Sequence, residues 1–383
     1  MFSSSGSTVA VIGAGIVGLS QAWLAARHGH RVLLFERHAL AAGASIRNFG
    51  MVWPIGQPAG SRYRIAMRSR ELWLEAIAQA GLWHDPCGSL HLAYAEDEAA
   101  VLREFADRGS EQGYACTWLE PADVQQRSPA ARRSGLLGAL WSPMELCIDP
   151  REATRKLPHW LAKQHAVECH FGTTISHIAL PEIVASDGRV WKVDRAIVCS
   201  GADFELLFPA VFAQAGLRRC KLQMLRTTVQ PNHWRLGPML AGGLTLRHYR
   251  NFEICPSLPA LRQRIAHQSP ELDALGIHVM ASQHADGRVT LGDSHEYDSA
   301  IEPFDRQEID TLILRELHRL LELPSWEISE RWHGIYAQYP NRACFINHPE
   351  PNVTIVNAPG GAGMTMSFGI ADQLWQDGTL KDE

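Results

Sequence analysis

The chain begins with a strand-like run, a glycine-rich turn and a helix-forming segment in direct succession. Residues 8–12 are apolar and β-prone, residues 19–27 favour a helix, and the turn between them reads Gly13-Ala14-Gly15-Ile16-Val17-Gly18. A second apolar run, residues 31–35, ends on Glu36. Continuous apolar strands around a helix are typical of a parallel sheet that is covered on both faces. The sequence therefore predicts an N-terminal βαβ unit.

The glycines of this turn have the GxGxxG spacing, in the context that gives the motif its meaning. Gly13 permits the tight turn, Gly15 lets the backbone approach a pyrophosphate, and Gly18 allows the helix to pack closely on the strand. The phosphates then meet the positive end of the helix. Glu36 is placed to bind a ribose 2′-hydroxyl, and its charge disfavours a 2′-phosphate, which argues against NADP. The motif predicts a dinucleotide site for NAD or FAD.

The elements that follow this unit distinguish between NAD and FAD as the cofactor. A nicotinamide dehydrogenase would continue with regular βαβ units, but residues 64–81 and 96–113 have helical periodicity and irregular segments surround them. Strands that end in glycine turns return only at residues 195–202 and 353–363. This distribution fits FAD threaded through one discontinuous domain.

The segments in between predict a second sheet. Residues 222–229, 244–254, 277–283 and 289–292 alternate like antiparallel strands, and residues 305–321 form an amphipathic helix. Alternation along 244–254 would send Arg247 and Tyr249 to one face and His248 and Arg250 to the other.

Composition excludes several classes of protein. The 383 residues carry a net charge of -5 with dispersed basic residues, which argues against a nucleic-acid binder. We find no apolar run of the roughly 18 residues that a membrane span needs. The polar start of the chain does not read as a signal peptide, so we expect a cytoplasmic protein.

The eight cysteines predict neither a disulfide framework nor a metal site. They are scattered along the chain without a CxxC pair. His84, Cys87 and His91 stand close together, but Pro86 and Gly88 break any helix that would align them. We assign no metal ligands from the sequence.

Four blocks carry a resemblance to a known family: residues 9–36, 43–50, 193–202 and 352–366. In this order they resemble the FAD-dependent amine and amino-acid oxidoreductases that include D-amino acid oxidase, glycine oxidase and sarcosine oxidase. The resemblance implies an α/β fold, α+β overall, with a Rossmann-type FAD-binding domain interrupted by an antiparallel-sheet substrate domain. It implies FAD-binding segments 1–84, 141–215 and 325–383, and substrate-binding segments 85–140 and 216–324.

The resemblance also implies which residues hold FAD. The glycine turn would contact the pyrophosphate, Glu36 and Arg37 the adenosine side, and Ile175 the adenine. Ser200-Gly201-Ala202 would pass under the cofactor. Ser45, Arg47 and Asn48 would lie along the flavin side. Gly361-Ala362-Gly363-Met364-Thr365 would cover the isoalloxazine carbonyls and the ribityl chain, where unpaired N–H groups can stabilise negative charge.

The block from Arg47 to Gly60 is similar to a branch associated with phosphonate catabolism. This implies oxidation of the C–N bond of 2-aminoethylphosphonate or its N-methyl derivative, with hydride transfer to flavin N5 and hydrolysis of the imine to phosphonoacetaldehyde. The amino-acid oxidases place a carboxylate-binding arginine after a glycine near residue 335, whereas this chain reads Gly334-Ile335-Tyr336. That departure puts a simple α-amino acid in doubt.

An anionic substrate needs paired or donor-rich contacts. The candidates for binding it are Arg47, Arg247 and Gln338, and the candidates for catalysis are His248, Tyr249, His333 and Tyr336. His333 and Tyr336 lie three apart on an expected strand, so at most one of them should face the flavin. Oxygen or another acceptor would reoxidise the cofactor. The alternatives are an amino-acid, glycine, sarcosine or hydroxy-acid oxidase or dehydrogenase, and a flavin-binding protein without catalysis.

Overall fold

The computed structural model describes residues 6–381 and contains the expected βαβ unit. Strand β1 (Thr8–Ile12) leads into helix α1 (Ile16–Arg27), which returns to strand β2 (Arg31–Glu36). The two strands pair in parallel, with Val9 opposite Val32 and Val11 opposite Leu34. These side chains are buried, as the continuous apolar runs predict.

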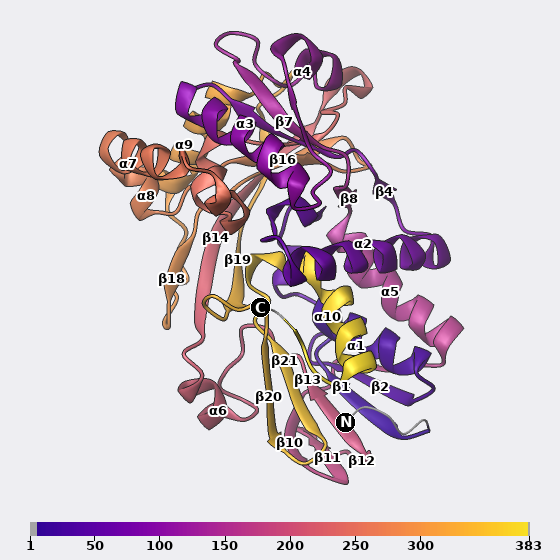
Figure 1. Ribbon diagram of the computed structural model, residues 1–383. Coiled ribbons are helices and arrows are strands. Elements are labelled where there is room, and N and C mark those ends of the chain that lie inside the picture. Colours follow the sequence, from indigo (N-terminus) through magenta and orange to yellow (C-terminus); the bar gives the residue numbers. More distant parts are fainter. Residues whose placement is uncertain (1–5, 382–383) are drawn as a thin grey trace.

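A six-stranded sheet forms the lower lobe in Figure 1. Its order is β20-β21-β13-β1-β2-β9. The added strands are β9 (Glu168–Phe171), β13 (Arg195–Val198), β20 (Phe345–Glu350) and β21 (Val353–Asn357). The β20–β21 pair is antiparallel, and the other pairs are parallel.

Helices and a small sheet bury this lobe's strands. Apolar residues of α1, α2 (Ser61–Ala80), α5 (Pro150–His165) and α10 (Gly363–Asp377) share one core with the sheet. A second core joins the strands to the sheet of β10 (Ile175–Ala179), β11 (Glu182–Ala185) and β12 (Val190–Lys192). Short α6 (Pro209–Gln214) follows.

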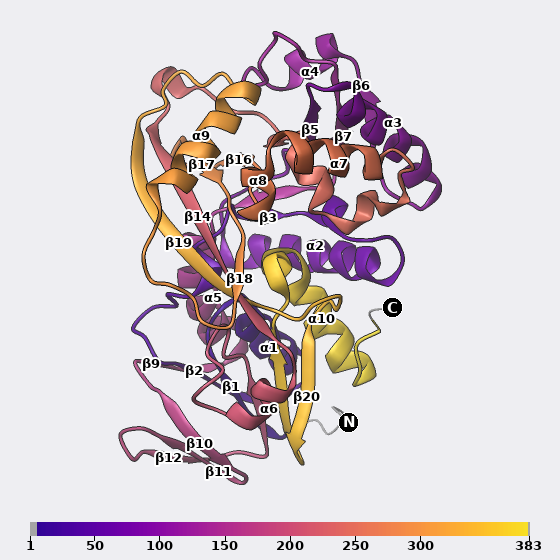
Figure 2. The same cartoon turned by 90° about the vertical axis from the view of Figure 1, so that its left-hand side faces the viewer.

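The upper lobe contains a nine-stranded sheet that is largely antiparallel. Its path is β18-β14-β17-β16-β15-β5-β7-β6, and β19 pairs with β14. Strands β14 (Arg218–Val229) and β19 (Ile328–Gln338) are its longest and run down beside the lower lobe (Figures 1 and 2). The others are β5 (Ser89–Ala93), β6 (Thr117–Leu119), β7 (Gly138–Ser142), β15 (Met239–Ala241), β16 (Met280–Gln283), β17 (Arg288–Gly292) and β18 (Glu296–Asp298).

Two cores hold helices against this sheet. One includes α3 (Glu96–Glu111) and α7 (Leu258–Gln268), and the other includes α9 (Gln307–Leu320) and α8 (Pro270–Ala274). Helix α4 (Pro121–Arg127) contributes Val124. A fourth sheet has the order β3-β8-β4, with β3 (Met51–Val52), β8 (Leu146–Ile148) and β4 (His84–Asp85).

The predicted strand over residues 244–254 is wrong. This segment forms two 3₁₀ helices, Gly243–Arg247 and Arg250–Ile254. Its backbone bonds are local, for example from Thr245 N–H to Gly242 O at 3.0 Å and from His248 N–H to Thr245 O at 3.0 Å. Because these groups are satisfied within the segment, the strand alternation expected for Arg247 to Arg250 does not apply.

The sheets show how the expected domains are distributed, although their boundaries stay predictions. All six strands of the lower sheet come from segments that the sequence assigned to FAD binding. Strand β19 also lies in such a segment, yet it pairs with β14 in the upper sheet. The mixed α/β fold class is confirmed.

The structure also bears on the cysteines and on membrane-spanning helices. All eight cysteines are free thiols. Among residues 6–381, no helix combines the length and the apolar character that crossing a membrane requires.

Candidate active site

The turn between β1 and α1 leaves no room for side chains. Gly13 has a φ of 106°, and a Cβ there would lie 2.3 Å from the carbonyl oxygen of Cys199 on the neighbouring strand end. A Cβ on Gly18 would lie 1.7 Å from Gly13 O. Both obstacles are backbone atoms, so glycine is required for this close packing of α1 on the sheet.

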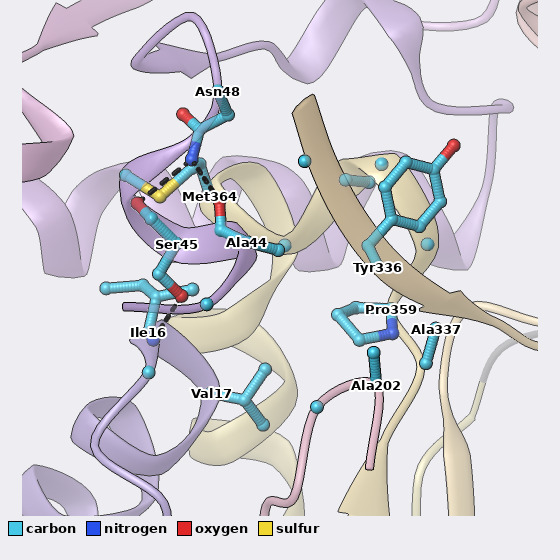
Figure 3. A pocket seen from close by; sticks show the side chains of 18 of the residues that line it. Ile16, Val17, Ala44, Ser45, Asn48, Ala202, Tyr336, Ala337, Pro359 and Met364 are labelled. Carbon is cyan, nitrogen blue, oxygen red and sulfur yellow. Dashed lines mark hydrogen bonds between the residues drawn. The ribbon is translucent and has the colours of Figure 1, made fainter. Parts of the chain in front are cut away.

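Side chains that follow β2 hold the start of α1. Ser45 Oγ accepts the Ile16 N–H at 2.9 Å, and Figure 3 shows the serine directed at the first turn of the helix. The buried Glu36 carboxylate accepts the Ala14 N–H at 3.0 Å and the His38 N–H at 3.1 Å. Asn48 donates to the carbonyls of Ala44 and Ser45 and closes this loop. The loop after β2 thus positions the phosphate-binding turn.

A cavity of about 570 Å³ extends from this turn to the upper sheet. It is lined by most of the residues that the sequence singled out. They are Gly13, Gly15, Ile16, Val17, Glu36, Arg37, Ser45, Arg47, Asn48, Ile175, Ser200, Gly201, Ala202, His248, Tyr249, Tyr336, Gln338, Gly361, Ala362, Gly363, Met364 and Thr365. Ala14 and Gly18 shape the turn from behind instead of lining the cavity.

The C-terminal glycine segment forms another wall. Helix α10 begins at Gly363, and the Thr365 hydroxyl accepts the Trp53 N–H at 2.8 Å. A Cβ built on Gly361 would lie 3.6 Å from the Tyr336 hydroxyl oxygen. Figure 3 shows Tyr336, Pro359 and Ala202 around one part of the cavity. Two helix starts, those of α1 and α10, therefore face the same space.

These features fit an FAD molecule. The glycine backbone at residues 13–18 and the start of α1 suit a pyrophosphate, because N–H groups at a helix start bind anions. The start of α10 supplies a second positive helix end, and the cavity volume is in the range of cofactor sites.

Three polar residues that line the cavity, Arg37, Arg47 and Gln338, have protein partners. Arg37 Nη2 donates to Asp203 Oδ2 at 2.5 Å, and Arg47 Nη1 donates to the carbonyl oxygen of His333 at 3.1 Å. Gln338 Oε1 accepts from Arg218 Nε at 2.7 Å. Of these, Arg47 is half-buried and lies where the loop after β2 meets β19.

Two residues expected to contact the substrate, Arg247 and His333, do not line the cavity. Arg247 donates to Asp273 and to the carbonyls of Leu244, Leu272 and Ile277, so its guanidinium is used within the upper lobe. His333 Nδ1 lies 2.9 Å from Asp305 Oδ1, on the opposite face of β19 from Tyr336. The proposed contacts of Arg247 with substrate and of His333 with the reacting atoms are therefore corrected.

The structure adds a cluster of cavity residues that sequence reasoning missed: His278, Asp293 and His295. They stand beside His248, with ring centroids 4.1 Å apart for His248 and His278 and 4.5 Å apart for His248 and His295. The three histidines lie on separate segments, so no local spacing reveals them. The one sequence signal that could have indicated the cluster is that polar residues, Asp293 and His295 among them, directly follow the buried strand that ends at Gly292.

Burial dominates the electrostatics of this cluster. It lowers the pKa of His248 and His278 well below the usual value, and lowers the pKa of His295 to about 4. It raises the pKa values of Tyr249 and Tyr336. At neutral pH the imidazoles are uncharged and both tyrosines keep their protons.

Comparisons with known proteins agree with this geometry. A family model described as FAD dependent oxidoreductase (DAO) matches residues 8–376. The 4-methylaminobutanoate oxidase (formaldehyde-forming) of Paenarthrobacter nicotinovorans is 29% identical over 199 residues, 50% of this chain and 24% of that enzyme. The L-2-hydroxyglutarate dehydrogenase of Salmonella houtenae is 24% identical over 295 residues, 74% of this chain and 62% of that enzyme. The matches thus span less than two thirds of each of these relatives.

A solved structure shows the same fold. Glycine oxidase from Geobacillus kaustophilus superposes with a TM-score of 0.77 at 17% identity, over 99% of this chain and 97% of that one. The family match covers nearly the whole chain, and the glycine turn, the helix starts and the cavity suit the same cofactor. The chain therefore belongs to the DAO family of FAD dependent oxidoreductases, and its cofactor is FAD.

Proposed function

We propose that this enzyme oxidises the C–N bond of a small amine that carries an anionic group, with 2-aminoethylphosphonate and its N-methyl derivative as the candidate substrates. The observation that carries the proposal is one cavity whose lining includes the glycine turn, the start of α10 and the arginines Arg47, Arg250 and Arg342. A buried or half-buried anion needs such cationic partners.

A relative supports the amine half of the proposal. The matching segment of 4-methylaminobutanoate oxidase belongs to an enzyme named for a methylamine that carries a distant carboxylate. The strand β19 reads Trp332-His333-Gly334-Ile335-Tyr336 and offers no arginine where amino-acid oxidases bind an α-carboxylate. An anionic group farther from the nitrogen suits a cation elsewhere in the wall, such as Arg47.

FAD, when bound, accepts the hydrogen and the electron pair that the substrate C–H bond loses. The chain provides position and electrostatics. The segment Gly361–Thr365 and the start of α10 face the flavin side of the cavity. Apolar Leu222, Met224 and Met280 limit water around the amine. Arg47 holds the anionic group.

The titratable side chains of His248, Tyr249 and Tyr336 are neutral at neutral pH. His248 lines the cavity and is held uncharged by burial. Tyr249 and Tyr336 keep their protons at neutral pH, so they act as hydrogen-bond donors. An amine that arrives deprotonated needs no base.

Anaerobic reduction of the bound flavin tests the proposal. We expect bleaching by 2-aminoethylphosphonate or N-methyl-2-aminoethylphosphonate, and none by ethylphosphonate, which has the anion without the amine. Glycine, sarcosine and 4-methylaminobutanoate complete the panel. If carboxylated amines bleach the flavin and aminophosphonates do not, the substrate assignment is wrong; if no amine does, amine oxidation is wrong.

Hydroxy-acid oxidation is the second candidate, because L-2-hydroxyglutarate dehydrogenase matches 74% of this chain. Such an enzyme would have its flavin bleached by 2-hydroxyglutarate or a related hydroxy acid in the same assay. Reduction by a hydroxy acid alone would favour this candidate over the amine.

A further inference from the structure

Three histidines from distant parts of the upper lobe converge on one point of the cavity wall. His248 follows the first 3₁₀ helix, His278 precedes β16, and His295 lies between β17 and β18. One ring nitrogen from each lies within 4.8 Å of the others. Because all three line the cavity, a small ion can reach them.

The cluster contains buried polar atoms without a protein partner. His278 and Asp293 are both buried. Within residues 6–381, the two ring nitrogens of His278 and the Oδ1 atom of Asp293 have no hydrogen-bond partner. His278 Nε2 is 3.6 Å from Asp293 Oδ1, and His295 Nε2 is 3.8 Å from Asp293 Oδ2. Ligands at about 2.0–2.1 Å from one zinc ion are about 3.4 Å from each other, so these spacings resemble those around a shared ion.

A backbone contact orients one of the imidazoles. His295 Nδ1 lies 3.2 Å from Gly276 O, and a carbonyl can only accept, so this nitrogen carries the proton. The proton on Nδ1 leaves Nε2 with its lone pair on the side of Asp293. Metal-binding histidines are held in this way, with the second nitrogen donating to a carbonyl or carboxylate.

We propose that His248, His278 and His295 bind one divalent metal ion of the zinc type in the cavity wall, with the Asp293 carboxylate beside His278 and His295. Three neutral imidazoles and a carboxylate are donors that zinc accepts. The sequence assigned no metal ligands because the four residues come from three segments.

The ion adds positive charge where the substrate binds. With three neutral ligands and the Asp293 carboxylate beside the ion, the site has a net charge of about +1, and three protein ligands leave the fourth position of the zinc open. An anionic oxygen of the substrate can take that open position; this step rests on the proposed function. The ring of His295 lies 6.3 Å from that of Tyr336, whose hydroxyl borders Gly361, so the cluster adjoins the wall assigned to the flavin side.

Metal binding is tested on the FAD-loaded protein, purified without a histidine tag and stripped with a chelator. Zn²⁺ is titrated in competition with a chromogenic chelator, and Co²⁺ is added separately because its visible bands report coordination. We expect about one tight equivalent of Zn²⁺ per chain. The variants His248→Phe and His295→Phe keep a ring and remove the ligand, and should lose that equivalent with flavin content unchanged.

His91→Phe is the matched control. His91 is buried in the same lobe, packs on Trp53 and Phe252, and also has unpartnered ring nitrogens, but it lies outside the cluster. This variant should retain the equivalent. Wild-type protein that binds no stoichiometric Zn²⁺, or cluster variants that bind it as tightly as wild type, would overturn the metal site. If either His248→Phe or His295→Phe fails to fold, zinc binding by the other variant still tests the metal site.

Ethylphosphonate separates the two parts of the proposal. Its affinity, read from the perturbed flavin spectrum, should rise about tenfold or more when Zn²⁺ is restored. Bound Zn²⁺ without this gain refutes the anion contact and leaves the metal site standing. The proposed function fails by a different observation, a flavin that no amine reduces with or without Zn²⁺.

Discussion

The backbone N–H of Trp53 donates to Thr365 Oγ1 at 2.8 Å and joins two buried residues 312 positions apart. Next to this bond, Trp73 Nε1 donates to Met364 O at 2.7 Å. The first turn of α10 is therefore fixed to the segment that follows β3 and to α2. In this way the two ends of the chain form one cofactor cavity.

Removing the acceptor in this link should destabilise the protein. Thr365→Val preserves shape but leaves the buried Trp53 N–H unpaired, which costs about 1–3 kcal/mol. We expect the free energy of unfolding, measured with denaturant at saturating FAD, to fall by about that amount. Thr365→Ser retains the hydroxyl and is the control. Equal stability of the valine variant and wild type would show that the bond contributes nothing.

A methyl group at Gly18 should impair FAD binding. The added carbon would lie 1.7 Å from a backbone oxygen, so α1 must move away from the turn. We expect Gly18→Ala to raise the FAD dissociation constant about tenfold or more, a loss of about 1.4 kcal/mol. In the control Gly109→Ala, the new carbon meets only the ring of Phe105 in the other lobe. Fluorescence titration of FAD measures both, and unchanged affinity in Gly18→Ala would contradict the prediction.

The contiguous parts of the cofactor site could be predicted from the sequence, whereas the contacts between distant segments could not. The turn from Gly13 to Glu36 was predictable because its strand, glycines and helix are contiguous and each constrains its neighbour. Residues 244–254 were assigned to a strand because apolar and polar residues alternate there, although local backbone bonds decide the conformation. The pairing of β16 and β17 brings His278 close to His295, and His248 reaches them from a separate 3₁₀ segment, so no local pattern encodes the cluster.

Glu36 should contribute to cofactor affinity through its charge. Its carboxylate accepts the N–H of Ala14 in the glycine turn and the N–H of His38 after β2, and Glu36 lines the cavity. Hydrogen bonds to charged groups contribute about 1.5–3 kcal/mol, so Glu36→Gln should weaken FAD binding about tenfold. Glu111→Gln, at the exposed end of α3, is the control. The idea fails if both variants bind FAD as wild type does.

Arg47 should act on substrate binding more than on turnover. Under the proposed function, Arg47→Met removes a cation from the cavity wall, and KM for the aminophosphonate should rise about tenfold while kcat changes less. Arg103→Met, an exposed arginine over Trp118, is the control. Steady-state kinetics with an anionic and an uncharged amine measure the difference. A loss of equal size for both amines would mean that Arg47 does not read the anionic group.

Glu145 should make stability depend on pH. Its fully buried carboxyl accepts the Ile55 N–H at 3.1 Å and the Ser89 hydroxyl at 3.0 Å, and burial raises its pKa above 4.5. Between 4.5 and the raised value, the folded state holds this proton more tightly than the unfolded state. The free energy of unfolding therefore falls as pH rises through that window.

Replacing the carboxyl by an amide should remove this dependence. Glu145→Gln cannot ionise, keeps an acceptor for Ile55 and can donate to the serine, so its stability relative to wild type should increase as pH rises from 4.5. Ser89→Ala removes a donor that lowers the pKa, and should make the fall steeper than in wild type. Denaturant unfolding across pH measures all three proteins. Parallel curves for wild type and Glu145→Gln would show that the buried carboxyl is ionised equally well in both states, and that its hydrogen bonds fully offset the cost of burial.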